Sequence, residues 1–249
     1  MTRFQPDLIH QLNSEVHIWQ HDPASIITPI QIERCEAVLS AEERERLGQF
    51  YHQRDQHTFL VSHAMLRCTL SAYIDKDPAE WLYEKNKYGR PEIMPEQNTC
   101  GLRFNLTHTQ GYVACIVSKL TDCGVDAEWI DRNTDVEAIA QSVFSTSEQL
   151  DIQRQSVEDK KQRFYQYWAL KEAYVKAMGK GLSYPLDKFA IQFGTNKDIS
   201  VRTSPECPTD ASWQFYSATL SSKHVIAAAI KHESSHRRVD FVCKQHSCL

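Results

Sequence analysis

Apolar and polar residues follow two different periodicities along this chain, and their order predicts an alternation of helices and strands. Apolar residues recur every three or four positions in "DQHTFLVSHAMLRCTLSAYI" (55–74) and "KQRFYQYWALKEAYVKAM" (161–178), which predicts two long helices. The segments "EVHIWQ" (15–20), "LRFNLTHTQGYVACIVSKL" (102–120) and "CGVDAEWI" (123–130) have the composition of strands. Within the second of these segments, "THTQG" is expected to be a loop between two strands.

Shorter segments fill the rest of the pattern. Ser40 followed by Glu43 has the spacing of a capping box and predicts that a helix begins in "SAEERERLGQF". In the second half, helices are expected at 134–145 and 146–153, before β structure returns. The expected late strands are "FAIQF" (189–193), "SWQFYSATL" (212–220), "HVIAAAI" (224–230) and "RVDFV" (238–242).

Elements follow one another in a similar order before and after position 120. We therefore predict an α+β fold built from a pseudo-twofold duplicated unit, with an N-terminal half (1–120) and a C-terminal half (121–249). Each half is expected to be a small, mostly antiparallel sheet packed with helices. No low-complexity linker separates the halves, so we expect them to pack together, with the active site in the cleft between them.

Composition narrows the class of protein without identifying it. The chain has 249 residues, 41% of them hydrophobic and 24% charged, and a net charge of −4, as in an ordinary globular protein. No segment is dominated by lysine and arginine, which argues against nucleic-acid binding. The apolar runs are too short to cross a bilayer and the N-terminal segment lacks the zones of a signal peptide, so we expect a cytoplasmic protein. The eight cysteines are scattered without zinc-type spacing and are expected to be reduced thiols.

Two carboxylates in "GVDAEW" are candidates for metal binding. Asp126 and Glu128 lie two positions apart on a predicted strand, so both side chains project from the same face. Such a pair suits Mg²⁺, which takes one or two protein carboxylates and fills its other positions with water and phosphate. The alternative is that both acids simply face water.

A stripe of side chains on the long C-terminal helix supplies further candidates. Phe164, Trp168, Glu172 and Lys176 recur every four residues and therefore lie along one side of the helix. Trp168 is expected to anchor the stripe in the core, with Glu172 and Lys176 emerging half-buried at its edge. The alternative is an ordinary ion pair between Glu172 and Lys176 on a solvated face. Gly179 is expected to end the helix with a left-handed cap.

The first half offers a histidine and several arginines. His108 lies in the expected loop just before the boundary between the halves, although a single histidine in a loop is commonly a surface residue without chemistry. Arg90 in "YGRP", with Arg46, Arg54 and Arg67, is expected to bring positive charge to the same cleft.

Taken together, these motifs resemble the 4′-phosphopantetheinyl transferases of the Sfp type. That family joins a G-[IV]-D-x-E strand to a W-x-x-K-E-[AS]-x-x-K helix some forty residues later, and this chain has "GVDAE" and "WALKEAYVK" at that separation. "FNLTHT", "KYGRP" and "GKGL" resemble further family segments, with Arg90 where the family has lysine. The motifs extend from about Arg46 to Phe189. The arginine-rich first helices of the family are matched only loosely.

The resemblance implies an enzyme that uses Mg²⁺ to transfer phosphopantetheine from coenzyme A to a serine of an acyl or peptidyl carrier protein. It also implies a monomer whose N-terminal half holds the nucleotide end of coenzyme A and whose C-terminal half carries the metal and the catalytic helix. Glu172 would be the general base, directly or through water, and Lys176 and His108 would contact phosphate. The implied metal ligands are Asp126, Glu128 and Glu172, and the implied coenzyme A contacts are Arg46, Arg54, Arg90, Thr107, His108 and Lys176.

Two other classes of function stay open at this point. Another Mg²⁺-dependent phosphotransferase would be expected to carry a phosphate-binding glycine loop, and the sequence contains no GxxxxGK[ST]. A degenerate relative that binds coenzyme A or a carrier without catalysis would be expected to have lost an acid, and all three are present. The carrier, whether of fatty-acid, polyketide or nonribosomal-peptide synthesis, is not defined by the sequence.

Overall fold

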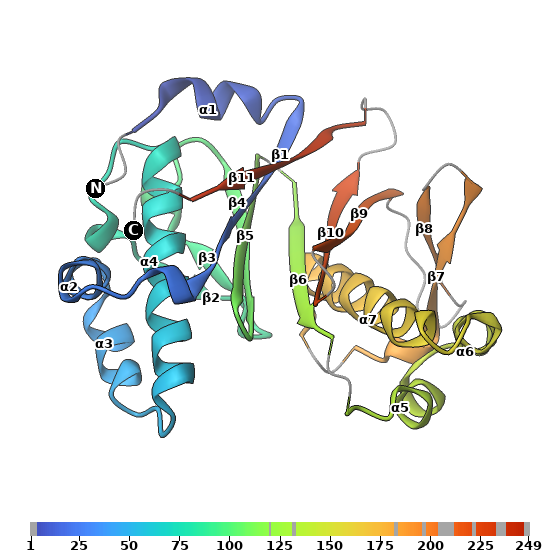
Figure 1. Cartoon of the computed structure of the whole chain (residues 1–249). Helices are drawn as coiled ribbons and strands as arrows, with labels where there is room; N and C mark the ends of the chain where they lie inside the picture. The colour runs from blue at the N-terminus through green and yellow to red at the C-terminus, as the bar shows by residue number, and fades with distance from the viewer. Residues whose placement is uncertain are drawn as a thin grey trace. The chain divides into compact units, whose positions relative to one another are not determined.

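A computed structural model describes residues 4–119, 121–130, 133–181, 184–195, 198–203, 212–220, 223–232 and 238–246. The chain divides into two compact units, residues 1–120 with 239–249 and residues 121–238 (Figure 1). Both units combine helices with small, mainly antiparallel sheets, so the predicted α+β class is confirmed. The last strand departs from the expected division, because it pairs with the first strand and belongs to the first unit.

The first unit is built on a four-stranded sheet of order β11-β1-β5-β4. Strands β1, β5 and β4 are antiparallel neighbours, whereas β11 runs parallel to β1. The long helix α4 packs against β4 and β5 and supplies much of the buried core. The elements are α1 (Pro6–Gln11), β1 (Glu15–His21), α2 (Pro29–Ala37), α3 (Ala41–Leu47), α4 (Gln53–Tyr73), β2 (Tyr83–Lys85), β3 (Pro91–Ile93), β4 (Leu102–Thr109), β5 (Tyr112–Lys119) and β11 (Asp240–Gln245).

A chain of buried hydrogen bonds joins α4 to β1. Trp19 Nε1 donates to the Tyr73 hydroxyl at 2.8 Å, and that hydroxyl lies 2.6 Å from His17 Nδ1. The Glu15 carboxylate, 2.8 Å from His17 Nε2, can only accept, so Nε2 carries the proton of the neutral ring. Nδ1 is then an acceptor, and the Tyr73 hydroxyl donates to it. The network fixes His17 as a neutral tautomer, and burial lowers its pKa to about 4.

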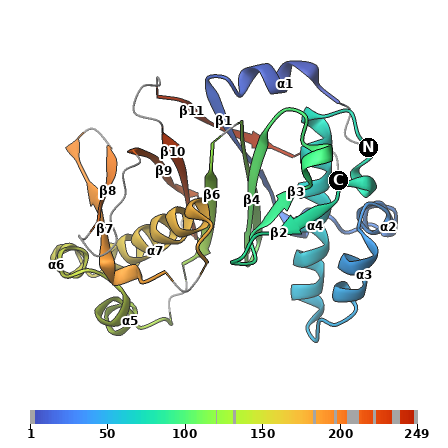
Figure 2. The same cartoon turned by 180° about the vertical axis from the view of Figure 1, so that it is seen from behind.

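The second unit is built around helix α7, which packs against strands β6 and β10 (Figure 2). Its main sheet has the order β6-β10-β9, with antiparallel pairing throughout, and β7 and β8 form a separate hairpin. This order differs from that of the first sheet. The elements are β6 (Cys123–Trp129), α5 (Val136–Val143), α6 (Thr146–Arg154), α7 (Asp159–Met178), β7 (Phe189–Phe193), β8 (Ile199–Thr203), β9 (Ser212–Leu220) and β10 (His224–His232).

Two glycines define how α7 sits in this unit. Gly124 of β6 lies directly against the helix backbone, since a Cβ atom there would be 2.1 Å from the Ala173 carbonyl oxygen and 2.5 Å from the Ala177 nitrogen. Gly179 ends the helix with φ of 65°, the left-handed cap expected from the sequence. The glycine of the "GVDAE" motif therefore serves close packing between the strand and the helix.

No helix in the described ranges is long and apolar enough to span a membrane.

Candidate active site

Acidic side chains of β6 meet the stripe of polar residues on α7. Asp126 and Glu128 follow Gly124 at alternate positions and so project toward the helix. The Lys176 ammonium lies 2.6 Å from Asp126 Oδ1 and also donates to the Val125 carbonyl at 3.2 Å.

Glu172 lies on the same stripe of α7 as Lys176, one helical turn before it. The charges of Asp126, Lys176 and Glu172 all shift the pKa of Glu128, so these groups lie close enough to interact. The structure therefore brings together Asp126, Glu128, Glu172 and Lys176, the four site residues predicted in the second half.

Burial and neighbouring charges shift the pKa values of Glu128 and Glu172. Burial raises the pKa of Glu128 to about 8, with a further contribution from Asp126, whereas Lys176 lowers it. Burial followed by the charge of Asp126 also raises the pKa of Glu172, again opposed by Lys176. Such mutual perturbation by carboxylates in a half-buried cluster is typical of functional sites.

The partner of Lys176 distinguishes between the two interpretations of the helix stripe, a half-buried site or a solvated ion pair between Glu172 and Lys176. Its ion pair in the structure joins α7 to Asp126 of β6, at 2.6 Å, and Asp126 is buried. The stripe is therefore part of a contact between two elements and not simply a solvated ion pair along one helix. The Lys176 ammonium interacts with Asp126, Glu128 and Glu172, so this cluster is a place in the structure where positive charge is favoured.

The donor chemistry of this cluster fits Mg²⁺. Across the part of the chain that the structure describes, no three histidine, cysteine, aspartate or glutamate side chains are gathered so that they would hold a metal ion as they stand. Mg²⁺ needs only one or two protein carboxylates, with water and phosphate as its other ligands. The pKa values of Glu128 and Glu172 are raised first by burial and then by the neighbouring negative charge of Asp126, and a divalent cation would relieve the second of these effects. The metal role of the three acids stays a prediction.

Trp168 packs as the sequence predicted. Its ring centroid lies 5.8 Å from that of Phe164 and 6.2 Å from that of Phe144, and the side chain packs against the core of the second unit.

Lys171, the lysine of the "WALKEA" motif, lies apart from the acid cluster. Its ammonium is completely buried and forms an ion pair with Glu148 of α6 at 2.9 Å. It also donates to the carbonyl oxygens of Leu186 at 2.7 Å and Phe189 at 2.6 Å. This residue joins α7 to α6 and to the segment that enters β7, a role that its neighbours in sequence do not reveal.

His108 lies on a strand, contrary to the expected loop. Strand β4 continues through Thr109, and the connection to β5 is a tight turn at Gln110 and Gly111, where Gly111 has φ of 74°. His108 pairs with Val113 and its side chain is exposed, whereas Thr107 beside it is buried. The alternation of the strand therefore separates these two predicted contacts onto opposite faces.

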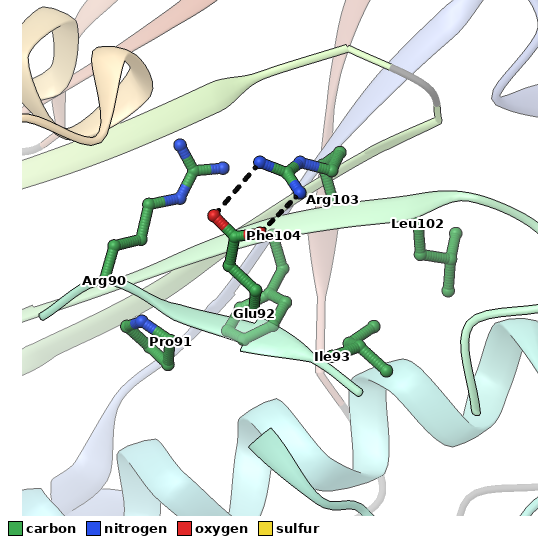
Figure 3. Close-up of a pocket in the computed structure, with 7 residues that line it drawn as sticks. All are labelled: Arg90, Pro91, Glu92, Ile93, Leu102, Arg103 and Phe104. Carbon is green, nitrogen blue, oxygen red and sulfur yellow. Dashed lines mark hydrogen bonds and ion pairs between the residues drawn. The ribbon is translucent and has the colours of Figure 1, made fainter. Parts of the chain in front are cut away.

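Arg90 lies at a small surface pocket of the first unit (Figure 3). Its backbone N–H donates to Asn86 Oδ1 at 3.0 Å, within a turn that includes Gly89 at φ of 87°. Inside the pocket Arg103 forms a bidentate ion pair with Glu92, at 2.9 and 3.3 Å. The lining residues are Arg90, Pro91, Glu92, Ile93, Leu102, Arg103 and Phe104.

The other arginines named from the sequence lie in different environments. The exposed Arg54 forms an ion pair with Asp55 at 3.2 Å, and the Arg46 guanidinium lies 5.4 Å above the Phe59 ring. Arg67 is buried, pairs with Glu43 at 2.7 Å and donates to the backbone carbonyls of Pro78 and Trp81. The expectation that Arg67 adds charge to a binding cleft is therefore wrong, because its guanidinium is used within the core.

Comparison with known proteins places these features in a family. Residues 122–229 match the model of the 4′-phosphopantetheinyl transferase superfamily, and residues 28–120 match that of the 4′-phosphopantetheinyl transferase N-terminal region. A 4′-phosphopantetheinyl transferase of Bacillus subtilis is 32% identical over 171 residues, 68% of this chain and 73% of the relative. HetI of Nostoc sp., also named a 4′-phosphopantetheinyl transferase, is 28% identical over 81% of this chain and 84% of its own length. The Sfp enzyme of Bacillus subtilis strain 168 is 28% identical over 79% and 85%.

A solved structure is similar to part of the chain. The holo-(acyl-carrier-protein) synthase of Bacillus anthracis, determined in complex with coenzyme A (3′,5′-ADP), aligns with 45% of this chain and 96% of its own at a TM-score of 0.39 and 17% identity.

The chain belongs to the 4′-phosphopantetheinyl transferase family. The predicted resemblance to the Sfp type, the enzyme class and the function of transferring phosphopantetheine to carrier proteins are thereby confirmed.

Proposed function

We propose that this protein transfers the 4′-phosphopantetheine arm of coenzyme A to a serine of an acyl or peptidyl carrier protein, with Mg²⁺, and that the acids of β6 and α7 form its catalytic centre. One observation carries the assignment of the centre. Asp126 and Lys176 make a 2.6 Å ion pair between the two motif-bearing elements, and Glu128 and Glu172 are electrostatically coupled to it.

The reaction breaks the pyrophosphate of coenzyme A. The serine oxygen attacks the β-phosphorus, a new P–O bond forms, and adenosine 3′,5′-bisphosphate leaves as the serine proton is removed. Asp126, Glu128 and Glu172 would hold Mg²⁺, which supplies charge neutralisation of the pyrophosphate and of the leaving phosphate.

Glu172 and Lys176 then have separate roles. Burial beside Asp126 raises the pKa of Glu172, so this carboxylate is better suited than a solvated one to take the serine proton near neutral pH, directly or through water. The 2.6 Å bond to Asp126 holds the Lys176 side chain at the centre, and this side chain would contact a phosphate oxygen as a point charge.

The first unit would hold the nucleotide end of coenzyme A. Arg90 is presented at the mouth of a pocket by an ordered turn, and Arg46 and Arg54 are exposed cations of the same unit. Thr107 and His108 follow one another on β4, and His108 would add a phosphate contact. Arginine in place of lysine at position 90 keeps the charge but offers a planar, bidentate donor.

We further propose that the protein acts as a cytoplasmic monomer on a soluble carrier. Carrier proteins are acidic helical bundles, and this chain has a net charge of −4. Attraction between them therefore depends on a local basic or apolar surface and not on overall charge.

The test is a modification assay on intact carriers. The protein is incubated with coenzyme A, Mg²⁺ and a panel of apo carrier proteins, and mass spectrometry follows the gain of one phosphopantetheine arm. Glu172→Gln should abolish the gain while circular dichroism stays unchanged, and the exposed Glu137→Gln is the matched control. If the protein bound coenzyme A but no carrier gained mass, the result would contradict the enzymatic function and favour a protein that only binds coenzyme A.

A further inference from the structure

The short helix α3 lies beside α4 in the first unit (Figure 1). None of the seven residues of α3 is buried, although Leu47 at its end packs partly against the core. A helix of this length has little stability of its own and depends on contacts with its neighbours. The side chains that join α3 to α4 therefore determine where the residues of α3 are held.

Glu43 of α3 uses both of its carboxylate oxygens in such contacts. Oε1 accepts from His63 Nδ1 at 2.9 Å, and Oε2 accepts from Arg67 Nε at 2.7 Å and from the Ser40 backbone N–H at 2.8 Å. His63 and Arg67 are four residues apart and so lie on adjacent turns of one side of α4. Glu43 thus closes the capping box of its own helix and joins that helix to two turns of α4.

The contact made by Glu43 is ionic at neutral pH. Burial alone would raise the pKa of this carboxyl group, but hydrogen bonds from His63 and Ser40 and the charge of Arg67 lower it to about 2. Hydrogen bonds in which one partner is charged are about twice as strong as those between neutral groups. The link between α3 and α4 is therefore a strong one for so short a helix.

Arg46 is placed by the same contact between helices. It follows Glu43 by three positions, so the two residues are neighbours on the surface of α3. The Arg46 guanidinium carbon lies 5.4 Å from the centroid of the Phe59 ring, and that ring lies 4.0 Å from the His63 ring between centroids. Phe59, His63 and Arg67 form one stripe of α4, and both residues of α3 contact it. A shift of α3 along this stripe would move the Arg46 guanidinium.

We propose that Glu43 is a positioning residue for coenzyme A binding, because it holds α3 against α4 and so keeps the Arg46 guanidinium where it contacts a phosphate of the nucleotide end. The inference rests on the proposed function, which takes Arg46 to be a coenzyme A contact. Glu43 itself is unsuited to that contact, since a carboxylate repels a phosphate. Both of its oxygens are directed at donors of α3 and α4, and it acts through Arg46.

The positioning role is tested by calorimetry with adenosine 3′,5′-bisphosphate, the nucleotide end of coenzyme A, on the full chain. Arg46→Ala should weaken binding about tenfold, as expected for loss of one charge-assisted hydrogen bond. Glu43→Gln keeps the size of the side chain but loses the charge and one acceptor oxygen. It should weaken binding by about threefold or more, and by no more than Arg46→Ala does. Glu42→Gln is the matched control on the same helix, because the Glu42 side chain is 85% exposed, and it should bind like the wild type.

A double-mutant cycle separates positioning from a general loss of structure. If Glu43 acts through Arg46, adding Glu43→Gln to Arg46→Ala should cause no further loss of affinity, because the guanidinium that it positions is already gone. In the carrier assay, Glu43→Gln should raise the KM for coenzyme A and leave kcat unchanged.

A second variant breaks the contact from the side of α4. His63→Phe removes the donor to Glu43 but keeps a ring beside Phe59, and it leaves the buried Arg67 paired. It should weaken nucleotide binding in the same direction, and it provides the test if Glu43→Gln does not fold by circular dichroism.

The outcomes separate this inference from the proposed function. Wild-type affinity in a folded Glu43→Gln, or in His63→Phe, together with weakened binding in Arg46→Ala, would overturn the positioning role and leave the proposed function intact. Losses that add in the double variant would also overturn it. Wild-type affinity in Arg46→Ala would remove Arg46 from the coenzyme A site, and the positioning role with it, while the carrier assay would still test the acids of β6 and α7.

Discussion

The buried ion pair between Lys171 and Glu148 gives a sharp test of what stabilises the second unit. Both side chains are completely buried, and the Lys171 ammonium is 2.9 Å from the Glu148 carboxylate. Lys171→Met keeps the length of the side chain but removes its charge, which leaves the carboxylate buried without its cation. Removing one partner of a buried pair typically costs about 3–5 kcal/mol.

The local contacts of Lys171 support the upper part of that range. The ammonium also donates to the carbonyls of Leu186 and Phe189, and each buried acceptor that loses its donor costs about 1–3 kcal/mol before relaxation. A double variant with Glu148→Gln should regain part of the loss, because glutamine keeps an acceptor for the Ile191 N–H but carries no charge. The double variant is therefore expected to be more stable than Lys171→Met alone.

The matched control lies on the same helix. Lys160 pairs with Glu137 at 2.7 Å, a similar distance, but the Glu137 side chain is 54% exposed. Exposed pairs contribute about 0–1 kcal/mol, so Lys160→Met should change stability little. Urea denaturation followed by far-ultraviolet circular dichroism measures all the variants. A loss below about 1 kcal/mol in Lys171→Met, equal to that in Lys160→Met, would refute the reasoning.

Three further predictions rest on other contacts. Gly124→Ala should destabilise the second unit by more than about 3 kcal/mol and abolish binding of Mn²⁺ used in place of Mg²⁺, because the added Cβ would overlap the α7 backbone. Gly48→Ala is the control. The nearest neighbour of its added Cβ would be 3.4 Å away, so the change in thermal unfolding should be small. Burial lowers the pKa of His17 and of His246 to about 4. The unfolded chain therefore binds protons that the folded chain does not as pH falls from about 6.5 to 4, and each histidine should reduce the free energy of unfolding by up to about 3 kcal/mol. Urea titrations at several pH values check this, and a flat profile would contradict it. Asp126→Ala should weaken turnover and its dependence on Mg²⁺ together, and an unchanged metal requirement in the carrier assay would exclude β6 as the metal site.

Periodicity was sufficient to predict the elements that carry the site. The alternation in "GVDAEW" placed Asp126 and Glu128 on one face, and the four-residue spacing on α7 placed Glu172 and Lys176 on one stripe. Both are properties of a single element, and local sequence determines them. The capping box at Ser40 and the left-handed Gly179 are local in the same sense.

Contacts between distant elements were beyond the sequence analysis. The partner of Lys171 is Glu148, which occupies position N3 in the capping box of helix α6. No local sequence pattern connects these two residues. The ion pair between Lys176 and Asp126 depends on a register set by the contact of Gly124 with α7. His108 was assigned to a loop because its polar neighbours resemble one, although strand pairing continues past it.

The parallel pairing of β11 with β1 has a consequence for synthesis of the chain. The pairing joins Glu15 to Asp240, so the first sheet combines segments from opposite ends of the sequence. In the sequence, the residues of the second unit (121–238) come between these two segments. On the ribosome, the second unit is complete while the first sheet still lacks an edge strand. Folding units generally form as they emerge, N-terminal first. Here the unit that begins first is finished last, and its open edge at β1 stays exposed to other chains until residues 240–245 arrive.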